Sequence, residues 1–223
     1  MLKQPFLLKK IAMLRQLGRA WIALLIIPFM AVAAQAAEYE EGVHYTRLAK
    51  QVRTQDPSKV EVVEMFGYWC PHCNNFERYL EPWKKKLGDQ AYFKHIPVVF
   101  RPNQTEFAKA YYIAKALGVE DKTHSGLFSL IHRQRQWINN KEQLGEFFAN
   151  YGVDEASFNK VYNSFSINSQ LSSGNKKASA YQITGVPSLV VNGKYLVSAE
   201  SAGSQRNMLK VVDYLIAKER AEL

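Results

Sequence analysis

A chain of 223 residues with 47% hydrophobic and 22% charged residues is long enough to form one large domain or two small ones around a sizeable core. This composition excludes disordered, collagen-like and low-complexity proteins. The formal net charge of +9 would suit a protein that binds nucleic acid or a membrane surface, so the position of the basic residues matters.

The first 36 residues have the order of parts of a secretory signal peptide. Residues 1–19 carry five basic side chains and no acidic one, residues 20–34 are almost wholly apolar, and Ala34-Gln35-Ala36 supplies small residues for cleavage. The apolar run is shorter than the roughly 20 residues that cross a bilayer, and it contains Pro28. We therefore predict that residues 1–36 are cleaved on export. The remaining chain has no basic stripe, so nucleic acid is not an expected partner.

Two strands and one helix are predicted around the cysteines. Residues 44–48 suit a short first strand, and the valine-rich segment 59–66 suits a buried strand that ends before Gly67. The helix that follows shows an apolar stripe at helical spacing. The residues of this stripe are Phe76, Leu80, Trp83 and Leu87.

The chain contains two cysteines, Cys70 and Cys73, with Pro71 and His72 between them. A disulfide over this spacing closes too short a loop to stabilise the fold much. A structural zinc site needs four ligands, and the sequence offers the two cysteines and His72 without a second Cys-x-x-Cys or His-x-x-x-His motif to complete it. A c-type haem would need a histidine at the position of Asn74. The pair is therefore interpreted as a redox centre, with a Cu(I)-binding thiol pair as an open alternative.

The predicted position of Cys70 favours an acidic thiol. Pro71 suits the first position of a helix, so Cys70 stands where the strand ends and the helix begins. Helix N-terminal amides stabilise a thiolate, and a protonated His72 would add a positive charge. Cys73 lies one turn inside the helix and is expected to be more buried and less acidic.

The remainder of the chain continues with a strand at 91–100 and then turns helical from about residue 104. Asn140 with Gln143, and Asp154, are predicted helix starts. Asn192-Gly193 predicts a hairpin between two strand-like runs, and a final helix closes the chain. Four core-facing stripes are expected: Phe107, Ala110, Tyr111 and Ala114; Leu127, Leu130 and Ile131; Leu144, Phe147, Phe148 and Tyr151; Phe158, Val161, Tyr162 and Phe165. The histidines outside the cysteine motif are interpreted as ordinary surface or core residues: His44, His95, His124 and His132.

The element order and the motifs resemble the DsbA family of bacterial periplasmic thiol:disulfide interchange proteins. The resemblance rests on Cys-Pro-His-Cys at 70–73, on Gly185-Val186-Pro187 before the hairpin, and on the long helical segment between them. It extends over the chain that follows the signal peptide and implies an α/β, thioredoxin-like fold with an inserted helical domain. The thioredoxin-like domain would comprise 37–102 and 184–223, and the inserted domain 103–183.

This resemblance implies a periplasmic dithiol oxidase that passes its disulfide to reduced, unfolded exported proteins through a mixed disulfide on Cys70. A second substrate thiol would then displace Cys70, and Cys73 would reclose the disulfide on Cys70 during reoxidation or when a mixed disulfide aborts. No cofactor or metal is expected. A quinone-linked inner-membrane oxidase of the DsbB type would reoxidise the protein, which we expect to be a monomer. A disulfide reductase or isomerase, and a non-catalytic copper carrier or holding chaperone, remain alternatives.

Further site residues follow from strand alternation and from the resemblance. Glu64 shares a strand face with apolar residues, so we expect a buried carboxyl that exchanges protons with Cys73, and the resemblance places Lys94 near it. The Val186-Pro187 bond is predicted to be cis, with the Val186 backbone free to bind an extended substrate. Trp69 is a candidate for an apolar surface that contacts substrates.

Overall fold

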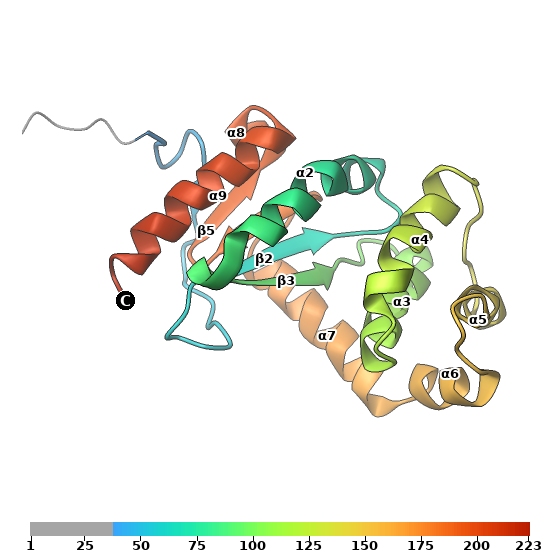
Figure 1. Cartoon of the computed structure of the whole chain (residues 1–223). Coiled ribbons are helices and arrows are strands. Elements are labelled where there is room, and N and C mark those ends of the chain that lie inside the picture. Colours follow the sequence, from blue (N-terminus) through green and yellow to red (C-terminus); the bar gives the residue numbers. More distant parts are fainter. Residues whose placement is uncertain (1–37) are drawn as a thin grey trace, which may run out of the picture. The chain divides into compact units, whose positions relative to one another are not determined.

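The computed structural model describes residues 38–223, of which Tyr39–Leu223 form one folded unit (Figure 1). The predicted signal peptide, residues 1–36, lies outside the described residues. Among the described helices, none is both long enough and apolar enough to cross a membrane.

A five-stranded mixed sheet forms the centre of this unit. Its strand order is β1-β5-β4-β2-β3, and β2 is parallel to β3 and antiparallel to β4. All residues of β2 are buried, which explains its valine-rich sequence, because a strand covered on both faces reads as a continuous apolar run. The three predicted strands before residue 104 are present and shorter than predicted. The strands are β1 (Thr46–Arg47), β2 (Glu61–Phe66), β3 (Tyr92–Pro97), β4 (Ser188–Val191) and β5 (Tyr195–Ser198).

Two helices cover one face of the sheet. Figure 1 shows α2 (Pro71–Leu87) and α9 (Gln205–Arg220) lying side by side over the strands. Their apolar stripes pack with the strand residues that point to this face, and this burial supplies a large share of the driving force for folding. This core includes Val62, Phe76, Leu80, Leu189, Val191, Met208, Val212 and Leu215.

The opposite face is covered by α7 (Phe165–Ala180), which the sequence did not reveal as a separate helix. Its residues Ala178 and Tyr181, at and just beyond its end, pack with Val63 and Met65 of β2. Gly174 allows the helix to pack closely against Tyr112, since a Cβ atom at position 174 would lie 2.7 Å from the Tyr112 hydroxyl oxygen. Because α7 packs through small residues, its sequence shows only a weak apolar stripe, and the pattern did not predict the helix.

Four further helices gather at the end of the sheet where β2 ends (Figure 1). The predicted starts at Asn140 and Asp154 are both present, and each side chain accepts a hydrogen bond from a backbone amide in the first helical turn. The predicted stripe that included Phe165 is wrong at that residue. Phe165 begins α7 behind the cap Ser164, and it is 86% exposed. The four helices are α3 (Thr105–Ala116), α4 (Glu120–His132), α5 (Lys141–Ala149) and α6 (Glu155–Tyr162).

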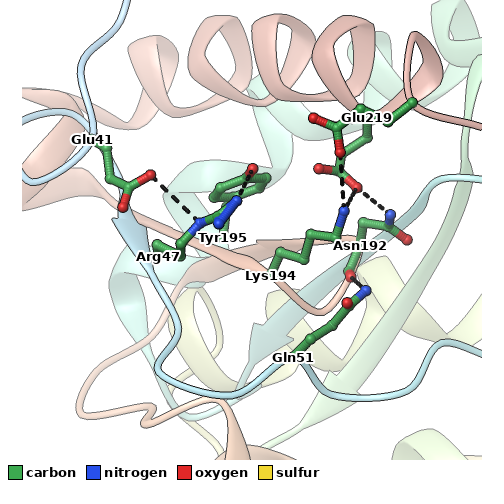
Figure 2. Close-up of polar contacts among 8 residues, drawn as sticks. Glu41, Arg47, Gln51, Asn192, Lys194, Tyr195 and Glu219 are labelled. Carbon is green, nitrogen blue, oxygen red and sulfur yellow. Dashed lines mark hydrogen bonds and ion pairs between the residues drawn. The ribbon is translucent and has the colours of Figure 1, made fainter.

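The hairpin turn is tied to the C-terminal helix. Asn192 and Gly193 adopt φ angles of 51° and 60°, as a tight primed turn requires, and Lys194 N donates to Val191 O. The carboxylate of Glu219 is buried on α9, where it accepts hydrogen bonds from the Asn192 side-chain amide and, at 2.7 Å, from Lys194 Nζ (Figure 2).

The segment that contains β1 is fixed to the same hairpin. Arg47 donates to the Tyr195 hydroxyl at 3.0 Å, and Gln51 Nε2 donates to the Asn192 carbonyl at 3.2 Å (Figure 2). These contacts and those of Glu219 bring three distant parts of the sequence together at one edge of the sheet. The short helix α8 (Ala199–Ala202), which connects β5 to α9, was not predicted.

Candidate active site

Cys70 is the residue that caps the N-terminus of α2, as the sequence predicted. Its backbone is extended (φ −91°, ψ 118°), and its carbonyl accepts the first helical hydrogen bond from Asn74 N at 3.1 Å. Pro71 occupies the first helical position, where its lack of an N–H costs nothing because that amide would have no partner in the helix. The strand, the turn and the helix therefore place the Cys70 thiol beside free helix amides.

The surroundings of Cys70 favour its thiolate. Its pKa is lowered from 9.0 to about 6, first by a hydrogen bond from the Cys73 thiol and then by the backbone amides of Cys73 and His72 and the charge of His72, against the effect of burial. The helix N-terminus thus acts as the sequence predicted, but the second thiol contributes more. Both cysteines are free thiols, so the structure represents the reduced form.

Cys73 has the opposite character. Its side chain is fully buried, and burial, the hydrogen bond to Cys70 and the charge of Glu64 all raise its pKa well above 9.0. A thiol in such surroundings holds its proton at neutral pH. The two cysteines are therefore different acids, with the negative charge placed on Cys70.

The loop before β4 lies against Cys70. The Val186-Pro187 bond is cis, as predicted, and the Cys70 sulfur lies 3.3 Å from the Val186 carbonyl oxygen, to which the thiol donates when it is protonated. The chain is held next to this point by Ser188, whose hydroxyl donates to the Gly185 carbonyl at 2.8 Å. The structure thus brings the cysteines and the predicted substrate-binding residues Val186 and Pro187 together.

Trp69 lies beside the reactive cysteine and is only partly buried. Its indole N–H donates to the Val98 carbonyl at 3.4 Å, and its ring meets the 44% exposed Phe100 edge to face. The Trp69 ring packs against Gly67, and a larger residue would not fit there, because a Cβ atom at position 67 would lie 2.5 Å from the Trp69 ring nitrogen. The two aromatic rings form a partly exposed apolar surface next to Cys70.

Glu64 is fully buried on β2, as strand alternation predicted. Burial, and next the charge of Glu77, raise its pKa well above the usual value, so the carboxyl retains its proton to unusually high pH. The residue facing it across the parallel pair is His95, whose Nε2 lies 3.0 Å from Glu64 Oε2.

The expected proximity of Lys94 to Glu64 is not what the structure shows. Lys94 pairs in register with Val63, and its ammonium group forms an ion pair with Glu61. Alternate residues of a strand point to opposite faces, so Lys94 belongs to the face covered by α7, and His95 takes the place beside Glu64.

The histidines near the site are more specifically bonded than the sequence suggested. His132 Nε2 lies 2.7 Å from the Tyr68 carbonyl oxygen, and His124 Nδ1 lies 2.7 Å from the Tyr68 hydroxyl. His124 Nε2 is 3.2 Å from the carboxylate of Glu77. Sequence reasoning missed Tyr68, Glu77 and the role of His124. Only Glu77 carried a local signal, since it lies one helical turn after Cys73.

Comparison with known proteins assigns the architecture to a family. A family model described as a DSBA-like thioredoxin domain matches residues 61–210. The chain is 41% identical to the thiol:disulfide interchange protein DsbA of Pseudomonas aeruginosa strain PAO1 over 190 residues, covering 85% of this chain and 90% of that protein. It is 38% identical to the Azotobacter vinelandii protein of the same name over 202 residues, covering 91% and 94%.

Solved structures give the same result. The crystal structure of Pseudomonas aeruginosa DsbA superimposes with a TM-score of 0.80 at 40% identity and covers 84% of this chain and 97% of that one. The oxidoreductase DsbA from Xylella fastidiosa superimposes with a TM-score of 0.77 at 31% identity and covers 82% and 98%.

Proposed function

The chain belongs to the DsbA-like thioredoxin family, and on this premise we propose that it is a dithiol oxidase that transfers its Cys70–Cys73 disulfide to reduced exported proteins in the periplasm. The observation that carries the proposal is the acidity of Cys70 beside the non-acidic Cys73. Stabilising the thiolate stabilises the reduced form of the pair, and a pair with a stable reduced form is a strong oxidant.

The reaction begins with the oxidised pair. A substrate thiolate attacks the Cys70 sulfur, the Cys70–Cys73 bond breaks, and a substrate–Cys70 mixed disulfide forms. The Cys73 sulfur leaves with the electron pair and takes up a proton, because burial makes its thiolate costly. Glu64, whose charge acts on Cys73, is the candidate donor of that proton.

A second substrate thiolate then attacks the substrate sulfur of the mixed disulfide. Cys70 leaves as a thiolate, and the low pKa of this group makes it a good leaving group at neutral pH. Two electrons have moved from the substrate dithiol to the protein. The product is a substrate disulfide and the reduced pair that the structure represents.

The surface around Cys70 suits an extended, unfolded polypeptide. The Val186 backbone borders the thiol, and the Val186-Pro187 segment offers an edge along which a substrate chain can lie. Trp69 and Phe100 add an apolar surface for the side chains that unfolded proteins expose. The reduced protein then needs an electron acceptor, for which we propose the quinone-linked inner-membrane oxidase of the DsbB type.

The first test is a redox titration of the purified protein in glutathione buffers, followed by tryptophan fluorescence or thiol alkylation. We expect a reduction potential well above that of glutathione. A potential near that of thioredoxin would overturn the oxidase assignment in favour of a reductase. Stoichiometric Cu(I) binding without oxidation of substrate thiols would instead indicate a copper carrier.

Two variants test which of the two cysteines forms the mixed disulfide with the substrate. When Cys70 of the Cys73→Ser variant is first converted to a mixed disulfide with oxidised glutathione, a substrate thiolate that attacks the Cys70 sulfur expels glutathione. The substrate–Cys70 disulfide should then accumulate, because no Cys73 thiol is present to displace the substrate. The Cys70→Ser variant should form none. Equal accumulation by both variants would contradict the assignment of Cys70 as the attacked sulfur.

A further inference from the structure

A second group of chemically active side chains lies beneath the redox turn. Glu77 of α2, His95 of β3 and His124 of α4 each offer one ligand atom, and these three atoms all lie within 4.8 Å of one another. Glu64 lies next to the group, with Oε2 3.0 Å from His95 Nε2, and Glu77 Oε2 lies 3.2 Å from His124 Nε2. Three elements distant in sequence therefore bring two imidazoles and two carboxylates together.

These atoms are buried but poorly satisfied by the protein. Both carboxylate oxygens of Glu64, and Nε2 of His95 and His124, have no hydrogen-bond partner among the described residues. The close nitrogen–oxygen pairs are within hydrogen-bond distance, yet they are not aligned as hydrogen bonds. The Glu64 side chain is fully buried and that of His95 is 5% exposed, so bulk water does not compensate for the missing partners. Buried polar atoms without a protein partner are places where an ordered water, a ligand or an ion can bind.

The spacing of the atoms suits a small divalent cation. Zinc binds imidazole nitrogen and carboxylate oxygen at about 2.0–2.2 Å, so neighbouring ligand atoms of a tetrahedral site are about 3.3 Å apart. The close pair of Glu77 and His124, at 3.2 Å, matches this edge length. The remaining separations, which reach up to 4.8 Å, exceed this edge by up to about 1.5 Å, so the side chains would close around the ion by that amount.

Features outside the cluster also suit a metal ion. His124 Nδ1 lies 2.7 Å from the Tyr68 hydroxyl, a contact that orients the ring and leaves a lone pair on Nε2 when Nδ1 carries the proton. A cavity of about 310 Å³ leads from the cluster, and the acidic residues in its lining outnumber the basic one, Lys84. Such a cleft concentrates cations. Its lining includes Glu77, Glu81, Lys84, His95, Glu120, Asp121, His124 and Ser125.

We propose that Glu77, His95 and His124 form a binding site for one divalent cation of the Zn²⁺ class, distinct from the cysteine pair. Imidazole with carboxylate is a donor set that suits zinc and neighbouring first-row metals and does not favour Ca²⁺ or Mg²⁺, which prefer oxygen ligands alone. This site departs from the sequence-based expectation that the protein holds no metal. It does not depend on the oxidase activity.

The test uses the metal-free protein with the Cys70–Cys73 disulfide formed, so that no thiol is available to bind metal. We expect isothermal titration with Zn²⁺ to show one equivalent bound per chain, and Co²⁺ in its place to give the visible absorption of a tetrahedral N/O site. His124→Gln should weaken Zn²⁺ binding at least about 10-fold. The matched control is His132→Gln, on the same helix and also bonded to Tyr68, which should leave the affinity unchanged.

A second variant provides an independent test in case His124→Gln does not fold. Glu77→Gln keeps the size of the side chain but removes the negative charge, and it should also weaken Zn²⁺ binding. Circular dichroism and the rate of Cys70 alkylation in the reduced variants establish that the fold is retained. The proposal is overturned if the oxidised protein binds no Zn²⁺. Unchanged affinity in His124→Gln and Glu77→Gln, or an equal loss in His132→Gln, would also overturn it.

Discussion

The Cys70 sulfur lies 3.3 Å from the carbonyl oxygen of Val186, although 116 residues separate the two in the sequence. The whole helical segment α3–α7 lies between them along the chain, and both of its ends return to the central sheet. The contact exists because β2 and β4 are paired, with Met65 opposite Ser188, so the turn after β2 and the loop before β4 meet at one edge. A substrate chain that pairs with the Val186 backbone is thereby placed beside the reactive thiol.

The hydrogen bond from Cys73 is the largest influence that lowers the Cys70 pKa, so its removal should be measurable. In Cys73→Ala no donor remains, and we expect the Cys70 pKa to rise from about 6 toward the ordinary value. In Cys73→Ser the hydroxyl can still donate, so the pKa should rise less. The measurement is the pH dependence of thiolate absorbance or of the alkylation rate. Equal pKa values in the two variants would show that the helix amides dominate instead.

The stability of the reduced protein should depend on pH more strongly than that of the oxidised protein. The folded pKa of Cys70 is about 6 and its ordinary value is 9.0, so between these limits the unfolded chain binds more protons. This stabilisation is therefore present above pH 9 and is lost as the pH falls through about 6. Cys73, with its raised pKa, acts in the opposite sense only above pH 9.

Urea unfolding of both redox forms between about pH 5 and pH 9 measures this difference. The oxidised protein has no titrating thiol, so it is the control for every other ionisable group. We expect the oxidised form to gain stability relative to the reduced form as the pH is lowered. A difference that is independent of pH across this range would contradict the assignment of an acidic thiol.

Local signals in the sequence predicted local structure well. Asp154 and Asn140 cap helices because their short polar side chains suit that position, and Asn192-Gly193 forms the turn because both residues tolerate positive φ. Cys70 at the helix start followed from Pro71 and the adjoining patterns. Each of these features depends on residues only a few positions apart.

The errors share a different origin, because each involves partners distant in sequence. The partner of Lys94 depends on the register of β2 and β3, which sets it opposite Val63. The contacts of His124 depend on the packing of α4 against α2. The helix α7 was missed because it packs through small residues such as Gly174, whose role is visible only when Tyr112 is in place.

Glu64 should influence the buried cysteine rather than the exposed one. Its negative charge contributes to the raised pKa of Cys73, so Glu64→Gln should lower that pKa. The effect should appear at high pH, because burial keeps the Glu64 carboxyl protonated at lower pH. Alkylation of Cys73 in the Cys70→Ser background reports the shift.

The matched control for Glu64 is Glu61→Gln, on the same strand. Glu61 is equally buried but pairs with Lys94 on the opposite face, so its neutralisation should leave the Cys73 pKa unchanged. An unchanged Cys73 pKa and an unchanged rate of disulfide exchange in Glu64→Gln would refute the proposed proton donor.

The contacts of Glu219 with the hairpin turn should matter for stability and not for redox chemistry. This carboxylate is 1% exposed and accepts from both Asn192 and Lys194, so Glu219→Gln replaces charged hydrogen bonds with weaker ones (Figure 2). We expect a loss of about 1.5–3 kcal/mol in the free energy of unfolding, because hydrogen bonds to charged groups contribute that much.

The control is Glu222→Gln. This residue contacts the same Lys194 at 3.3 Å, but its side chain is 53% exposed, and exposed ion pairs contribute only about 0–1 kcal/mol. Chemical denaturation of the oxidised proteins compares the stability of the two variants, and the Cys70 pKa, measured on the reduced proteins, should be unchanged in both. If Glu222→Gln destabilised the protein as much as Glu219→Gln, the charge of the lysine rather than the buried carboxylate would be the stabilising group, and the connection between α9 and the hairpin would need a different explanation.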